Sequence, residues 1–189
     1  MLGTWWARLL NNIAGVLAPQ IPTPTGDFES ISTQSLTGAT STITFSSIPS
    51  TYKHLHIRGL ILNSSTQNNL AFQFNSSGGT AYSAHQVQGN GSTTAANAST
   101  SSPYAYLEGL VDPSNTNAFV GVYDILDYAN TNKYKTLRGL SGQDRNGAGT
   151  VQLTSGLWQS TSAITSITIT LPGYTMGNYT TFALYGIKG

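Results

Sequence analysis

Three histidines are the residues of this chain best suited to holding a metal ion. His54 and His56 stand two positions apart, so on a β-strand both side chains project from the same face. Imidazole is a common ligand of zinc, copper, iron and nickel, and His85 is the remaining candidate for a third ligand. No HExxH motif or carboxylate-bearing partner motif accompanies them. We therefore interpret them as half-exposed strand residues and predict no metal and no other cofactor.

Carboxylates are the second group that could carry chemistry. A glycosidase needs two of them facing each other across a sugar, one with a raised pKa. Asp124 and Asp127 enclose Ile125 and Leu126 where a strand runs into a turn, and we expect Asp127 to organise that turn through hydrogen bonds to the backbone. A serine nucleophile is disfavoured because the chain has no G-x-S-x-G motif. The sequence predicts that the protein is not an enzyme.

The elements that would position these residues are β-strands. Ile43 and Phe45 alternate with threonines, and the same period of two recurs in NLAFQF at 69–74 and AITSITITL at 163–171. Further predicted strands cover 52–62, 82–88, 104–110, 119–126, 133–140, 149–158 and 181–187. About ten short strands separated by turn-rich stretches predict an all-β fold, an antiparallel β-sandwich of the jelly-roll kind. The polar stretch from Gly89 to Ser102 lacks apolar anchors and is predicted to be an exposed loop.

The first 18 residues follow a different period. Spacings of three and four place large apolar side chains on one stripe of a predicted amphipathic helix. These candidate anchor residues are Trp5, Trp6, Leu9, Leu10, Ile13, Val16 and Leu17. A signal peptide is the alternative, but Arg8 lies inside the segment and Asn11 and Asn12 interrupt an apolar core. The predicted organisation is an anchor helix at 1–18, a Pro-rich linker at 19–27 and a β-sandwich domain at 28–189.

Composition limits the partners. Charged residues make up 8 % of the 189 residues and the formal net charge is +1, whereas about 25 % of residues are charged in ordinary soluble domains. Without a basic run there is no electrostatic footprint for nucleic acid, and no segment is long and apolar enough for a membrane span. Low charge gives little repulsion between copies, which suits a protein that works in an assembly. We expect neither nucleic acid nor membrane as a partner.

Four stretches carry a resemblance to a known family. They are SSIPSTYKHLHIRGL at 46–60, DILDYANTNKYKTLRGLSG at 124–142, SGLWQSTSAITSITIT at 155–170 and FALYGIKG at 182–189. They resemble virion structural proteins of tailed bacteriophages, and the resemblance covers roughly residues 28–189 without the N-terminal segment. It implies a jelly-roll-like domain that occurs as capsid decoration or as part of a tail or fibre, and it implies no catalytic residues.

Two functions follow as expectations. The first is a head decoration or cement protein of the virion, assembled in the bacterial cytoplasm, homotrimeric, and anchored through its N-terminal segment to major capsid or tail proteins. The second is a tail or tail-fibre component, an adaptor or a domain that recognises host surface glycans. For glycans, Tyr104, Tyr106, Tyr174 and Tyr179 are the candidate sugar platforms.

Overall fold

A computed structural model describes residues 26–62, 68–111 and 116–189, and within these ranges the chain is all β with no helix. The side chains of residue 68 and of 108–111 are not described. The strands are β1 Phe28–Ser35, β2 Thr42–Phe45, β3 His54–Ile61, β4 Asn68–Phe74, β5 Tyr82–Gly89, β6 Thr94–Ser102, β7 Ala105–Val111, β8 Phe119–Leu126, β9 Lys135–Asp144, β10 Gly149–Trp158, β11 Ile167–Thr170 and β12 Thr181–Ile187.

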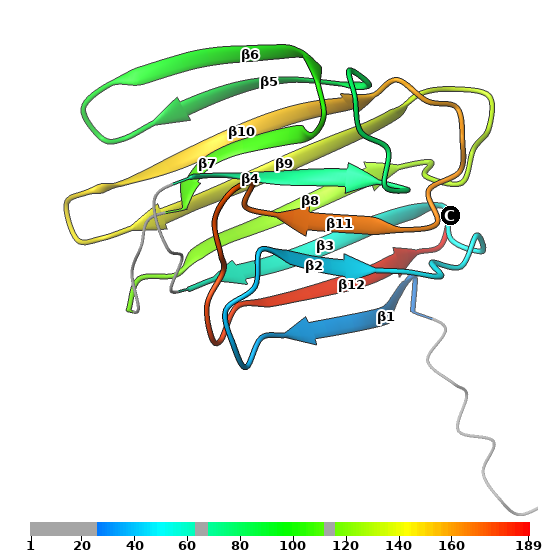
Figure 1. Cartoon of the computed structure of the whole chain (residues 1–189), viewed down its shortest axis with the longest axis horizontal. Helices are drawn as coiled ribbons and strands as arrows, with labels where there is room; N and C mark the ends of the chain where they lie inside the picture. Colours follow the sequence, from blue (N-terminus) through cyan, green and yellow to red (C-terminus); the bar gives the residue numbers. More distant parts are fainter. Residues whose placement is uncertain (1–25, 63–67, 112–115) are drawn as a thin grey trace, which may run out of the picture.

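Eight of these strands form a jelly roll. The early strands pair with the late strands in reverse order: β1 with β12, β2 with β11, β3 with β8, and β4 with β7, all antiparallel. This nested pairing is that of one long hairpin rolled into two sheets. The predicted antiparallel β-sandwich of the jelly-roll kind is therefore confirmed, and Figure 1 shows the four-stranded sheet, β2-β11-β4-β7, lying over the longer one.

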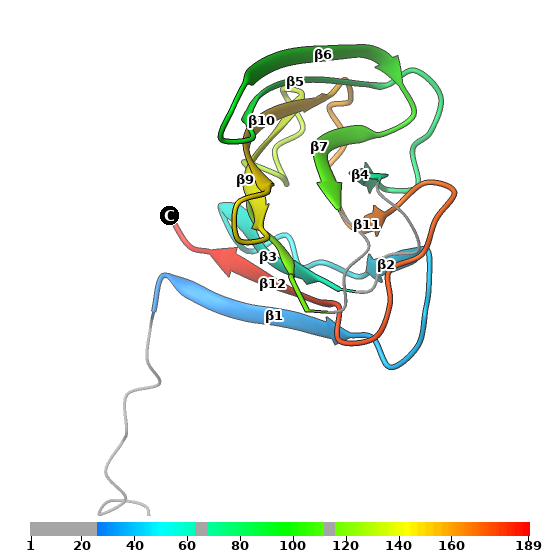
Figure 2. The ribbon, with the colours of Figure 1, turned by 90° about the vertical axis from the view of Figure 1, so that its left-hand side faces the viewer.

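Two hairpins inserted into the jelly roll lengthen the sheet that contains β1, β12, β3 and β8. The hairpin β5–β6 lies between β4 and β7 in the chain, and the hairpin β9–β10 lies between β8 and β11. β9 pairs with β8 and β10 pairs with β5, so both hairpins continue the same sheet. The resulting long sheet has the order β1-β12-β3-β8-β9-β10-β5-β6, and Figure 2 shows its far half curling around β7.

Aromatic rings fill the space between the sheets. Phe72 and Tyr123 meet across the sandwich with ring centroids 5.0 Å apart, and both side chains are fully buried. The Tyr123 ring lies over its own sheet at Gly139, where a Cβ would stand 2.6 Å from Tyr123 Cδ1. Gly139 is thus required by a close approach, because any larger residue would displace the ring from the core.

The strand pattern departs from the sequence prediction at two edges. The stretch 89–102 is not a loop: β6 occupies Thr94–Ser102 and pairs with β5, although nearly all its side chains are exposed. β1 likewise pairs with β12 at the opposite edge and was not predicted as a strand. An edge strand is held by backbone hydrogen bonds on one side and needs no alternating apolar face, so periodicity does not reveal it. The anchor helix at 1–18 and most of the linker at 19–27 lie outside the described residues.

Candidate functional site: the outer face of the long sheet

Toward the β9–β10 turn, the inserted part of the long sheet is apolar on its outside and polar on its inside. On β10, Val151 and Leu153 are exposed, while Gln152 and Thr154 between them are both 2 % exposed and face β7. On β9, Leu140 is exposed beside buried Ser141. The outer positions of a sheet on a protein that stands alone in water are normally polar. This reversal makes the outer face the candidate interaction surface of the protein.

The register brings the exposed apolar side chains together. Val122 stands opposite Leu140, Leu140 opposite Leu153, and Leu153 opposite Val87, so one row crosses four strands. The next row of the same face carries Val120 on β8 and Val151 on β10, which flank Gly142. Directly opposite side chains lie within about 5.5 Å of each other between Cβ atoms. We call this set the apolar band: Val87, Val120, Val122, Leu140, Val151 and Leu153.

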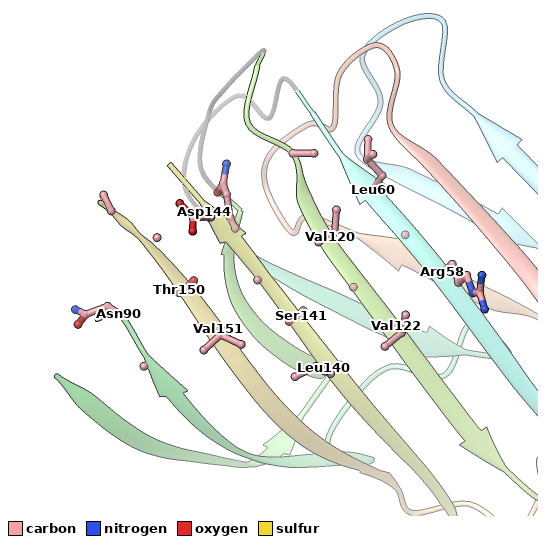
Figure 3. Close-up of a pocket in the computed structure, with 18 of the residues that line it drawn as sticks. Arg58, Leu60, Asn90, Val120, Val122, Leu140, Ser141, Asp144, Thr150 and Val151 are labelled. Atoms are coloured by element: carbon pink, nitrogen blue, oxygen red, sulfur yellow. The ribbon is translucent and has the colours of Figure 1, made fainter. Parts of the chain in front are cut away.

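Four members of the apolar band, Val120, Val122, Leu140 and Val151, line a broad hollow, and Val87 and Leu153 lie beside it. The exposed fractions in the band run from 39 % for Val122 to 59 % for Val151. The hollow measures about 1080 Å³, and the turns after β5 and after β9 wall it at one end. Figure 3 shows Val120, Val122 and Leu140 projecting from the sheet into this space, with Arg58 and Asp144 at its rim. A hollow with an apolar lining and few charges is suited to an apolar ligand surface, and not to a charged substrate.

A polar row borders the apolar band. Across the sheet from β3 to β5, the register aligns His56, Asp124, Arg138, Ser155 and His85. His56 Nδ1 and Asp124 Oδ1 share a hydrogen bond of 2.6 Å. Behind them Phe28 of β1 packs edge-on against the His56 ring, with centroids 5.2 Å apart. The outer face is therefore divided into an apolar part over β8, β9, β10 and β5 and a hydrogen-bonded polar part beside it.

The histidines lie as predicted on one face of a strand but do not converge. His54 Nδ1 accepts the backbone N–H of Asp127 at 3.0 Å, and His56 is bonded to Asp124. His85 lies on β5, four strand spacings from β3, which is roughly 19 Å. Within the residues that the structure describes, no three His, Asp or Glu side chains are grouped so that they could hold a metal ion.

Asp127 is held as a carboxylate by two lysines. The Lys133 ammonium donates to its side chain, and Lys53 Nζ lies 3.1 Å from Oδ1. These two cations lower the pKa of Asp127 to about 2. Its turn is thus organised by ion pairs rather than by the side-chain to backbone bonds that we expected. A carboxyl with so low a pKa does not retain a proton to donate at neutral pH, so Asp127 is unsuited to be the general acid of a glycosidase.

The four candidate sugar-binding tyrosines lie in two places. Tyr104 and Tyr106 are neighbours at the start of β7, with ring centroids 5.7 Å apart in an edge-to-face arrangement. Tyr174 and Tyr179 lie in the segment between β11 and β12, where they are 42 % and 74 % exposed. The side chain of Glu108, a further carboxylate of the chain, is not described.

Neither the apolar band nor the burial of Lys135 was predicted from the sequence. Apolar and polar side chains alternate in residues 149–158, but the local sequence does not indicate which of the two strand faces packs against the core. Lys135 is fully buried at the start of β9, and its Nζ donates to the carbonyls of Lys133 and Thr161. Burial lowers the pKa of Lys135. Its two carbonyl partners indicate that it fastens neighbouring loops together.

The candidate anchor residues from Trp5 to Leu17 fall outside the described residues, so the structure places none of them. Across the described ranges, no helix has the length and apolar character needed to cross a membrane. No protein family model, curated protein or solved structure matches this chain significantly.

Proposed function

We propose that this protein is a structural component of a tailed-bacteriophage particle, a head decoration or cement protein whose jelly roll stands on the particle surface. The apolar band carries the proposal. Six large apolar side chains lie side by side on the outside of the sheet, whereas a protein that works alone keeps such patches small. In an assembly the same face is covered by a neighbour, and each buried side chain then contributes about 1.5 to 3 kcal/mol before ordering costs.

Three further observations support an assembly role. The jelly roll is common among viral capsid domains, although the fold also occurs in lectins and enzymes. The charged fraction of 8 % leaves little electrostatic repulsion between copies. The four stretches that resemble virion proteins map to β3, to β8 and β9, to β10 and β11, and to β12, so they lie within the jelly roll and its β9–β10 insertion.

The proposed partners are other virion proteins and further copies of this chain, in a homotrimer. Residues 1–18 are the proposed anchor, with Trp5 and Trp6 among the side chains that a partner buries. The proposal assigns the protein no catalytic residue and no cofactor, because the features that carry it are all surfaces for packing.

The experiment compares the full chain with residues 19–189 for binding to particles assembled without this protein. We expect the full chain to bind saturably at a regular position in a particle density map, and the truncated chain to lose at least tenfold in affinity. Equal binding by both chains would remove the anchor assignment. A full chain that binds neither heads nor tails would remove the virion role itself.

A tail or tail-fibre component that recognises host glycans is the second candidate. The edge-to-face pair Tyr104 and Tyr106 favours it, since both rings are only partly buried and an aromatic face can stack on a sugar ring. A glycan array probed with the full chain tests this function. Binding that Tyr104→Ala and Tyr106→Ala both abolish, with Tyr134→Ala as the control at an exposed tyrosine that is not a candidate, would establish it. An array without signal would eliminate it.

A further inference from the structure

We propose that the hollow over the apolar band is the docking site for residues 5–17 of a second copy of this chain, so that neighbouring copies are linked by their N-terminal segments. The inference rests on the proposed role in an assembly and names the partner of the anchor. It joins two apolar surfaces: a sheet face that the described residues leave exposed, and the apolar stripe that the sequence predicts over residues 5–17.

The two surfaces match in size and chemistry. A helix over 5–17 would have a length of about 20 Å. The apolar band and its continuation to Leu60 on β3 cross five strands, from β5 to β3, a width of roughly 19 Å. An amphipathic helix laid into an apolar groove is a recurring mode of recognition. Arg8, the one charged residue between Trp5 and Leu17, would find a carboxylate, Asp144, at the rim of the hollow.

The direction in which the chain enters β1 favours a second copy over the same chain. The Lys188 N–H donates to the Asp27 carbonyl at 2.9 Å, so the β1–β12 ladder continues to Asp27, in line with the strand. Phe28 pairs with Ile187, at the end of the sheet where His54 lies. The apolar band begins four residues further along β3, about 13 Å inward, at the level of Arg58.

To reach its own band, the segment before Asp27 would have to reverse direction. Pro19, Pro22 and Pro24 stand in that segment, and proline-rich sequence favours an extended, semi-rigid course. Ten residues from 18 to 27 in that form span about 31 Å, which is enough to cross to a neighbour. The segment and the hollow are different surfaces, so the contact runs head to tail, which is the kind of contact that forms a ring such as a trimer when the rotation between copies closes.

Cysteine cross-linking of the full chain tests the docking, because the natural chain has no cysteine. Ala14→Cys flanks the apolar stripe, and Val151→Cys lines the hollow on the outer face of β10. The two single variants are mixed, oxidised mildly, and the linked peptides are identified by mass spectrometry. We expect a disulfide between position 14 of one chain and position 151 of another, formed at least ten times faster than in a mixture whose Val151→Cys chain also carries Leu140→Lys, a change in the lining of the hollow. A matched control adds Tyr174→Lys instead, an exposed apolar residue outside the hollow, and leaves the rate unchanged.

The other outcomes overturn the proposal. A chain that carries both cysteines and forms only an intramolecular disulfide at high dilution would show that the segment docks on its own sheet. Links only between two copies of position 151 would show two sheets packed face to face. A link that survives Leu140→Lys, with the fold of that variant verified by circular dichroism, would place the segment elsewhere. All of these use purified protein, so they leave the particle-binding test of the virion role independent.

Discussion

Thr154 and Thr170 are both buried threonines on strands, yet they differ in what their hydroxyls bind. Thr170 Oγ1 donates to the Ser41 carbonyl at 2.9 Å. Thr154 Oγ1 makes no hydrogen bond in the described part of the chain, and neither does the Gln152 side-chain amide two residues earlier. A buried polar atom without a partner costs stability. The inner face of β10 therefore weakens the fold at the same positions where the outer face displays valine and leucine.

The same substitution at these two sites is expected to act in opposite directions. Thr154→Val keeps the shape and removes an unpaired hydroxyl, so we expect the free energy of unfolding to rise by about 1 kcal/mol. Thr170→Val removes a hydrogen-bonded hydroxyl and leaves the Ser41 carbonyl with only the longer bond from the Leu171 N–H at 3.3 Å, which lowers the free energy of unfolding by about 1 kcal/mol. Urea unfolding followed by circular dichroism measures both. A loss of stability in Thr154→Val would mean that its hydroxyl is paired in solution.

Between elements, Tyr82 is the side chain that ties β5 of the inserted hairpins to β4 of the jelly roll. Its hydroxyl accepts the Phe74 N–H at 2.8 Å, and its ring stacks on Trp158 of β10 with centroids 6.3 Å apart. Burial raises the pKa of Tyr82 from 10.0 to about 12. The buried, neutral phenol of Tyr82 thus links the long sheet to the four-stranded sheet by a hydrogen bond.

This raised pKa predicts loss of stability in alkali. Between pH about 10 and about 12 the unfolded chain releases the Tyr82 proton while the folded chain keeps it, so the free energy of unfolding falls as pH rises. Two pKa units correspond to about 3 kcal/mol at most. Tyr82→Phe is expected to cost about 1 to 3 kcal/mol at pH 7, because the Phe74 N–H loses its partner, and to flatten the alkaline slope. Urea midpoints at pH 9 and pH 11.5 measure it, and equal slopes for both proteins would contradict the assignment.

The strands that sequence periodicity found are those with one face in the core. In β2, β8 and β12 the buried and exposed positions alternate regularly, and all three were predicted. β6 and β1 were missed because their places depend on pairing with a neighbour, a property of residues far apart in the chain. β11 is shorter than its predicted stretch 163–171, since only Ile167–Thr170 finds partners on both sides.

The candidate site was less predictable than the fold, for a related reason. Leu140, Leu153 and Val87 come from three separated stretches, and only the register of β9, β10 and β5 makes them neighbours. Alternation in each strand indicates an apolar face without telling whether it meets the core or the solvent. The position of the histidine pair on one face was predictable, because it depends only on the period of a strand.

At the scale of the whole molecule, the two inserted hairpins add an exposed apolar face to the eight-stranded jelly roll. The eight jelly-roll strands place their apolar side chains between two sheets, where Phe72, Tyr123 and Ile169 are fully buried. The β5–β6 and β9–β10 hairpins add most of the apolar band, and their inner face meets β7 through polar side chains such as Gln152. The architecture thus separates a core buried between two sheets from an exposed apolar face on the outside of the long sheet.

That separation predicts how association of the protein responds to salt. The six side chains of the apolar band carry no charge, and only Arg58 and Asp144 stand at the rim of the hollow. Screening by salt weakens contacts between charges, whereas excluded salts such as sulfate strengthen apolar burial. We expect the Kd of self-association, measured by sedimentation equilibrium of the full chain, to change less than about threefold between 50 and 500 mM NaCl and to tighten in ammonium sulfate. Leu140→Lys should weaken association at every salt concentration without lowering the free energy of unfolding, because Leu140 lies outside the core. A Kd that rises more than about tenfold with NaCl would show that ion pairs, not the apolar band, hold the copies together.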